Sequence, residues 1–226
     1  MRSLLVLPLL VSSVASAAPT TERREVAAFH AVDLSSGLEV SIGPGAPSLV
    51  LEGDAEALWS VTTTVTGGTL SVQRKGQGFP WKRTKPVTVR LTTPALSELS
   101  ASGGCDITLA PFPNRTLTLK LSGGVTLEAK GLELDQLTVE ASGGVEATLA
   151  GQCREASVDL SGGVVLDARA LTVTSAAVQA SGGCQVALTV LETVGGDANG
   201  GVDLVVHGHP RSVKVKTSGA ATVSAP

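Results

Sequence analysis

The chain has 226 residues and a formal net charge of −3 at pH 7, a mildly acidic balance that argues against nucleic acid as its main partner. Glycine accounts for 26 residues, only 2% of the chain is aromatic, and there is no tyrosine. This composition argues against a conventional β-sandwich, whose core usually holds aromatic residues, and favours a narrow interior of Val, Leu, Ile and Ala.

The first 17 residues have the features of a cleaved secretion signal. Met1-Arg2 gives a short positive start, Leu4 to Val14 is mostly apolar, and Ala15-Ser16-Ala17 has the small-residue pattern that a signal peptidase cuts. The apolar run is too short to cross a bilayer core of about 30 Å as a helix. We therefore expect an exported protein whose mature chain begins near Ala18. Loss of Arg2 leaves 16 basic and 20 acidic residues, a net charge of −4.

Residues 18–28 follow the signal and contain Pro19 and the charged run from Glu22 to Glu25. This composition predicts a short tether. The domain proper is expected over residues 29–226. Within it, residues 29–100 alternate less regularly, and Gly67-Gly68 lies between two strand-like runs, as in a hairpin turn. We interpret residues 29–100 as irregular N-terminal coils and a cap, because the exposed end of a repeat array would otherwise template association.

A basic loop is predicted inside this region, between residues 74 and 90. It contains no acidic residue, its glycines and prolines break regular structure, and Phe79-Pro80-Trp81 lies at its centre. Basic side chains around exposed rings could hold an anionic glycan, a lipid head group or an acidic peptide. The simpler interpretation is a solvated loop whose aromatic residues cap the end of the domain. The candidate binding residues are Arg74, Lys75, Phe79, Trp81, Lys82, Arg83, Lys85 and Arg90.

A repeated tripeptide organises residues 101–226. Ser-Gly-Gly recurs five times, followed by the related Asn199-Gly200-Gly201 and Ser218-Gly219-Ala220, at spacings of 18 to 20 residues. Each of these tripeptides is called a station below. Glycine suits a sharp corner because it takes a positive φ and has no Cβ to obstruct the next layer, so the stations are interpreted as structural corners. The five complete stations are Ser102-Gly103-Gly104, Ser122-Gly123-Gly124, Ser142-Gly143-Gly144, Ser161-Gly162-Gly163 and Ser181-Gly182-Gly183.

Each station lies between two runs of alternating apolar and polar residues, as in Leu117, Leu119 and Leu121 before one station and Val125 and Leu127 after it. Such alternation means that one side of each run is buried and the other is exposed. A meander of hairpins would also fit, since glycine pairs suit two-residue hairpin turns. The near-constant period favours stacked, equivalent coils. We therefore predict an all-β fold, a right-handed parallel β-helix (solenoid) with coils of about 20 residues.

Three cysteines, Cys105, Cys153 and Cys184, are too few and too widely spaced for a disulfide framework. Cys105 and Cys184 each follow a glycine pair, four coils apart. At the spacing of β-strands this is on the order of 19 Å, whereas a disulfide needs Cα atoms within about 7 Å. We expect all three to be small buried apolar residues.

Catalysis and metal binding have weaker support. Two positions before the stations, one outward column holds Glu140 and Asp159 one coil apart, close enough for the coupled carboxylates of a polysaccharide-cleaving enzyme. The rest of that column is mixed, as on a solvated face: Ser100, Lys120, Gln179, Asp197 and Lys216. His207 and His209 would share a strand face, but zinc needs at least three protein ligands. We predict no catalytic residues, no metal site and no cofactor.

Several short segments occur in a characteristic order along the chain. They are Phe29-His30-Ala31-Val32-Asp33, Leu38-Glu39-Val40-Ser41-Ile42, Thr66-Gly67-Gly68-Thr69-Leu70, Pro94-Ala95-Leu96, the stations, and Gly208-His209-Pro210. In this order they make the run from Phe29 to Pro226 similar to the putative auto-transporter adhesin, head GIN domain family of exported bacterial proteins. The resemblance implies a β-helical fold and an envelope location, and it carries over no catalytic residue. The chain departs from the family in using Ser-Gly-Gly rather than Ser-Gly-Ser-Gly stations and in lacking tyrosines near the Gly-x-Pro.

From these features we expect an exported, non-catalytic β-helix of the envelope or cell surface that serves as an interaction or scaffold module, with adhesion as one such role. The alternatives are a carbohydrate-active enzyme, a polysaccharide hydrolase or lyase, on a β-helix face, and a periplasmic accessory or sensor domain. The expected partner is an envelope or surface component, glycan or protein, and not nucleic acid. The expected location is the periplasm, the outer surface or the surrounding medium. No later stretch reaches about 20 apolar residues, so no transmembrane segment is predicted.

Overall fold

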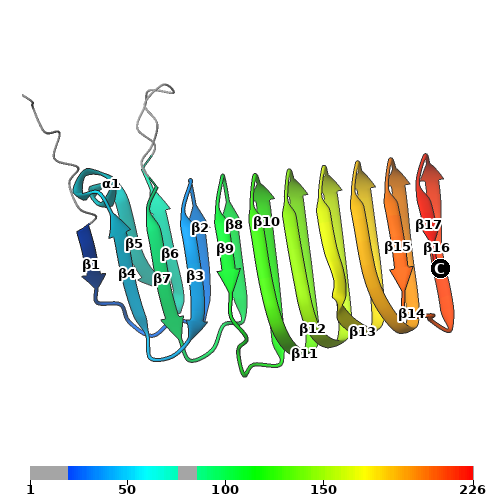
Figure 1. Ribbon diagram of the computed structural model, residues 1–226, viewed down its shortest axis with the longest axis horizontal. Helices are drawn as coiled ribbons and strands as arrows, with labels where there is room; N and C mark the ends of the chain where they lie inside the picture. Colours follow the sequence, from blue (N-terminus) through cyan, green and yellow to red (C-terminus); the bar gives the residue numbers. More distant parts are fainter. Residues whose placement is uncertain (1–19, 76–85, 226) are drawn as a thin grey trace, which may run out of the picture.

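A computed structural model describes residues 20–75 and 86–225 of the chain. It is a row of stacked β coils, a β solenoid of about six turns, and the coils advance along one axis from the N-terminal to the C-terminal end (Figure 1). The predicted β solenoid is confirmed. The expected signal over residues 1–17 lies outside the described residues.

The regular coils begin at residue 98 and are joined entirely by parallel strand pairing. Face A consists of the strand segments that precede the stations, and face B consists of those that follow them. The strands are β8 (Glu98–Ser102), β9 (Asp106–Leu109), β10 (Thr116–Gly123), β11 (Thr126–Gly143), β12 (Glu146–Gly162), β13 (Val165–Gly182), β14 (Gln185–Gly200), β15 (Asp203–His207), β16 (Ser212–Gly219) and β17 (Thr222–Ser224). The long strands β11 to β14 each contribute to both faces, with a shift of register at the bend between them.

Alternation along each strand builds the core. On face A, for example, Leu119, Val139, Val158 and Val178 are in register on successive strands and are fully buried. Each coil therefore adds one layer of Val, Leu and Ala to a continuous interior. Removal of this apolar surface from water is the main source of stability, at about 25 cal/mol per Å².

The stations lie in register along the edge between the two faces, so that Ser122, Ser142, Ser161 and Ser181 form one column. The first glycine of each complete station has a positive φ, from 77° at Gly103 to 95° at Gly182. The amide of the second glycine donates to the coil before it. Gly163 N donates to Gly143 O at 2.9 Å, and Gly183 N donates to Gly162 O at 2.8 Å. The corner is thus part of the hydrogen-bonded stack.

In the N-terminal part, the order of the strands in the stack differs from their order in the sequence. It contains β2 (Ala31–Ser35), β3 (Glu39–Pro44), β4 (Ser48–Gly53), the short helix α1 (Ala55–Trp59), β5 (Val61–Thr66), β6 (Thr69–Arg74) and β7 (Thr88–Thr93). β2 pairs with β8 on one side and β6 on the other, and β3 lies between β9 and β7. β2 and β3 therefore form the coil next to the regular ones, and the following segment extends the stack outward. The predicted hairpin turn at Gly67-Gly68 is confirmed by the antiparallel pair β5–β6.

Part of the predicted tether is wrong. Residues 20–24 form strand β1 (Thr20–Arg24), which pairs antiparallel with β4 as the outermost strand of face B. The charged sequence is typical of a solvated segment, but Glu22 and Arg24 are in register with the fully buried Leu51 and Leu49. They occupy inward positions at the end of the core. Inward charges on an edge strand close a sheet against further pairing.

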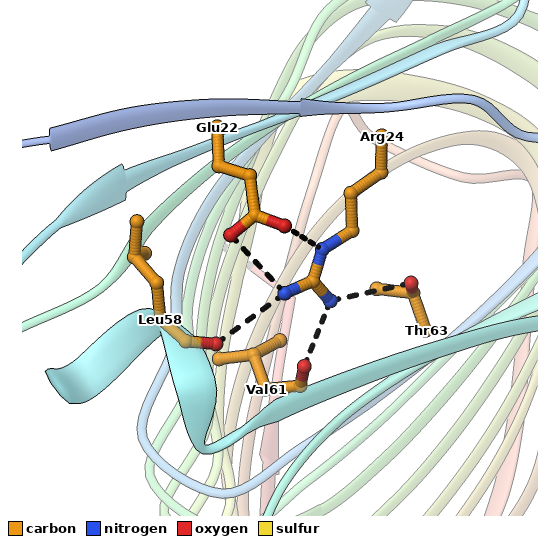
Figure 2. Close-up of polar contacts among 5 residues, drawn as sticks. All are labelled: Glu22, Arg24, Leu58, Val61 and Thr63. Carbon is orange, nitrogen blue, oxygen red and sulfur yellow. Dashed lines mark hydrogen bonds and ion pairs between the residues drawn. The ribbon is translucent and has the colours of Figure 1, made fainter. Parts of the chain in front are cut away.

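Arg24 ties this edge to the other face. Its guanidinium pairs with Glu22, with 2.8 Å between Nε and Oε1, and donates to the carbonyl oxygens of Leu58 at 3.3 Å and Val61 at 2.7 Å and to Thr63 Oγ1 at 3.3 Å (Figure 2). Leu58 belongs to α1, and Val61 and Thr63 belong to β5, the outermost strand of face A. One side chain therefore spans the N-terminal end of the solenoid.

All three cysteines are buried and free, as predicted. Cys105 and Cys184 occupy the inward position directly after their stations. Burial raises the pKa of Cys105 and Cys153 above the usual range of a thiol, so these thiols are in their neutral form at pH 7.

Candidate binding faces

Face A carries a groove over its C-terminal half. Its volume is about 640 Å³, and it crosses the strands from β11 to β16. One outward column forms its floor, and the side chains shrink along that column from Thr138 through Ser157 and Ala177 to Gly195. Because neighbouring strands of a sheet are evenly spaced, the loss of side-chain volume along a column hollows the surface.

The groove is lined by polar side chains together with apolar ones such as Ala156 and Ala177. Beside the floor runs a second outward column, made of Gln136, Glu155, Ser175, Thr193 and Ser212. Together the two columns present five hydroxyl groups, one carboxamide and one carboxylate, and Lys214 lies at the C-terminal end. Thr193 Oγ1 donates to Ser175 Oγ at 3.0 Å, so these hydroxyl groups already bond to one another across strands. Such a surface can exchange hydrogen bonds with a polar ligand along its whole length.

The outward column that holds Glu140 and Asp159 has the register that the repeat spacing predicted. Glu140 and Asp159 are in register on adjacent strands, with Lys120 before them and Gln179 after them. They line a smaller hollow of about 380 Å³. The ammonium of Lys120 lies 3.0 Å from Glu98 Oε1, and this hydrogen bond raises the pKa of Lys120. Glu140 and Asp159 are therefore neighbours on an open, mixed-charge surface.

A tight ion pair on face B joins Arg169 and Asp167. Arg169 Nε lies 2.9 Å from Asp167 Oδ1, and its Nη2 also bonds to Asp167. The hydrogen bond from Arg169 lowers the pKa of Asp167 to about 2. With Gln185, Asp203 and His207, the pair lines a hollow of about 360 Å³. The two residues are two positions apart on the exposed side of one strand, so each is the ion-pair partner of the other.

The structure separates the described ends of the basic loop. Arg74 ends β6 on face A, where its Nε donates to Ser60 Oγ at 3.2 Å, and the amide of Lys75 donates to Ser60 O. Arg90 lies on β7 of face B and pairs with Glu52 at 3.3 Å. The remaining candidates, Phe79, Trp81, Lys82, Arg83 and Lys85, lie outside the described residues. A binding role for the loop stays a prediction.

Two further observations concern the ranges 20–75 and 86–225. No helix there is long and apolar enough to span a bilayer. The histidine, cysteine and acidic side chains form no group of three placed to hold a metal ion. His207 lies on β15 near the C-terminal end, and His30 precedes β2 near the N-terminal end.

Comparison with known proteins places the chain in a family. Residues 28–210 match the model of the putative auto-transporter adhesin, head GIN domain. The chain belongs to this family. The match covers the N-terminal coils and every station except the last, and β1, β16 and β17 lie outside it. No curated protein matches the chain.

Solved structures share the fold of this GIN domain. A putative adhesin from Bacteroides fragilis superposes with a TM-score of 0.84 at 16% identity, covering 92% of this chain and 97% of that one. A putative lipid binding protein from Parabacteroides distasonis gives a TM-score of 0.73 at 16% identity, covering 93% and 98%. A putative adhesin from Parabacteroides merdae gives 0.67 at 16% identity, covering 93% and 97%. At this identity the likeness concerns the fold alone.

The groove on face A was not among the sequence predictions, although its signal was present. The residue four positions before the serine or asparagine of each station runs Glu98, Thr118, Thr138, Ser157, Ala177, Gly195 and Lys214. Reading this one column across coils, rather than along the chain, shows the shrinking side chains that make the groove.

Proposed function

We propose that this GIN domain is a non-catalytic adhesive module of the cell envelope that binds an extended polar ligand, a polysaccharide strand, in the groove on face A. The observation that carries the proposal is the groove itself, an open channel of about 640 Å³ lined by hydroxyl, carboxamide and charged groups. In this proposal the protein is exported and works at the outer surface. Two of the structural neighbours are putative adhesins, which supports the same role here.

The geometry of the groove favours a strand over a compact ligand. The groove crosses five strands from β11 to β16, a length of about 19 Å at the usual strand spacing. Its floor is flat, because Ser157, Ala177 and Gly195 project little. A chain of sugar units lying along the solenoid axis would meet a hydroxyl-bearing residue on each strand from β11 to β16. A lipid tail would offer these hydroxyl groups no hydrogen-bond donor or acceptor.

Filling the groove should weaken this binding. The double substitution Ala177→Gln and Gly195→Gln adds two side chains to the floor, and it is tolerated by the fold because Gly195 has no positive φ and only Lys214 O lies near an added Cβ, at 3.9 Å. We expect affinity for the bound polysaccharide to fall by about tenfold or more, since lost contacts and lost space act together. Binding would be measured on an array of surface polysaccharides and then by titration calorimetry.

The matched control for the groove variant is Ala187→Gln. Ala187 is an outward residue of face B, on the same strand β14 as Gly195. It should leave polysaccharide binding unchanged. Equal binding by the wild type and the groove-filled protein would mean that the polysaccharide binds outside the groove on face A. Binding of phospholipid vesicles in place of polysaccharide, lost in the groove-filled variant, would assign the groove to lipid and contradict the proposed ligand.

The alternative of a polysaccharide-cleaving enzyme rests on the register of Glu140 and Asp159, which are neighbours on adjacent strands. The double variant Glu140→Ala and Asp159→Ala separates the two functions. A binding module should release no reducing ends from any polysaccharide it binds, and the double variant should retain the wild-type affinity. Release of reducing ends by the wild type, lost in the double variant, would establish the enzyme instead.

A further inference from the structure

The terminal coil of the solenoid leaves its apolar side chains uncovered. Val213 on β16 is 38% exposed, whereas Val194, its register neighbour one coil earlier, is 1% exposed. Val215 on the same strand and Val223 on β17 are only partly buried. Within the described residues, β16 pairs only with β14, and β17 pairs only with β15. This end therefore combines apolar side chains with a row of backbone groups that have no strand partner.

The opposite end is built differently. There the inward positions of the outermost strand β1 hold Glu22 and Arg24, and Arg24 is bonded across the end to α1 and β5 (Figure 2). Charges at inward positions block the addition of another strand, because they would have to be desolvated. At the C-terminal end, the inward positions of β16 on face A hold Val213, Val215 and Thr217. None of these three inward residues of β16 is charged.

The charge of this end also differs from that of the whole chain. Residues 204–226 contain Arg211, Lys214 and Lys216 and no acidic residue, although the chain as a whole has a net charge of −3. Lys214 and Lys216 project from the exposed side of β16. Within the described ranges, neither has an ion-pair partner. The edge of the last coil thus presents two unpaired positive charges at alternate positions.

We propose that β16 receives an extended segment of a partner protein in which apolar and acidic residues alternate. Added as a further strand, such a segment would cover Val213 and Val215 with its apolar side chains. Its acidic side chains would lie beside Lys214 and Lys216 on the exposed side, at the spacing of neighbouring strands. Face A already contains a pair of this kind, since Lys120 bonds to Glu98 on the adjacent strand at 3.0 Å.

Charge argues against a second copy of this chain as the occupant. Antiparallel pairing of two β16 strands about their centre would set lysines of one copy beside lysines of the other, and like charges directly opposite destabilise a sheet. Head-to-tail stacking would lay β16 against β5 of the next copy, where the Arg24 guanidinium bonds to Val61 O and Thr63 Oγ1, and it would bury that charge beside Val213 and Val215. An acidic, apolar strand from a partner meets neither obstacle.

The test uses the purified protein and two fluorescein-labelled peptides of eight residues, the length of β16. One peptide alternates valine with glutamate, and the other alternates valine with lysine. We expect fluorescence anisotropy to show binding of the glutamate peptide and about tenfold weaker binding of the lysine peptide. The double variant Lys214→Glu and Lys216→Glu should reverse this preference. Equal binding of the two peptides, or a preference that the double variant does not change, would overturn the proposal.

Three controls make the result specific. Lys130→Glu with Arg154→Glu changes the net charge equally at exposed positions of other coils and should leave the preference intact. Val215→Glu imitates the inward charges of β1 and should abolish binding of both peptides. Because Lys214 also borders the groove of the proposed function, the groove-filled variant Ala177→Gln and Gly195→Gln is included and should bind the glutamate peptide normally.

A dimer detected by sedimentation velocity and lost in the Val215→Glu variant would assign the edge to a second copy and refute the proposed partner.

Discussion

Replacing Gly182 by alanine should lower the free energy of unfolding by about 3 kcal/mol, whereas the same replacement at its neighbour Gly183 should cost about 0.5 kcal/mol or less. Gly182 has a φ of 95°, and an added Cβ would lie 2.8 Å from Gly162 O in the preceding coil. Both the strained φ and the backbone clash would have to be relieved by moving the corner. At Gly183 the nearest atom to an added Cβ is 3.9 Å away.

The two glycines form a matched pair for this experiment, because they are adjacent, exposed and identical in type. Urea denaturation would give the unfolding midpoint of each variant and of the wild type. The midpoints report stability directly if the dependence of the free energy of unfolding on urea is the same for all three. The last station supports the expected difference, since Ala220 occupies its second position and Gly219 keeps a φ of 74° at its first. Equal losses for the two variants would mean that glycine at the stations has a role other than the left-handed corner.

Replacing Arg24 by methionine should lower the free energy of unfolding by about 2 kcal/mol or more, because a hydrogen bond from a charged group contributes about 1.5 to 3 kcal/mol. Methionine keeps much of the side-chain volume but leaves the carbonyl groups of Leu58 and Val61 and the carboxylate of Glu22 without their donor. The closure of the N-terminal end depends on these bonds. The N-terminal strands should therefore loosen first.

Hydrogen exchange followed by mass spectrometry would locate this effect. Peptides from β1, α1 and β5 should exchange faster in the Arg24→Met variant, while peptides from β12 and β13 keep their protection. Arg23→Met is the control, since Arg23 is exposed on the same strand and points away from the core. If Arg23→Met cost as much stability as Arg24→Met, the account of Arg24 as a bridge across the end would be wrong.

The repeat made the regular coils predictable in detail. A constant spacing of stations puts equivalent residues side by side, so the inward columns and the Glu140–Asp159 neighbours follow from counting alone. Buried, free cysteines follow from the same frame, because Cys105 and Cys184 stand where other coils have valine. Periodicity works here because each layer contacts only the next one.

The N-terminal region was less predictable, because its contacts cross the chain order. No spacing in residues 45–97 indicates that the segment leaves the stack and returns beside β3, so the order β6–β2–β8 comes from tertiary packing. Strand β1 was missed for a related reason. Its charges, Glu22 and Arg24, are typical of solvated chain, and only the end of the core gives them inward, half-buried positions.

The stacking of successive repeats as parallel coils is tested most directly by a distance between spin labels at Ser100 and Lys216, with the three buried cysteines replaced by valine. These residues belong to one outward column, six strand spacings apart. Parallel coils predict a backbone separation of about 29 Å, or about 4.8 Å for each repeat. A meander of hairpins would place two strands in every repeat, and a separation near 58 Å would contradict the solenoid.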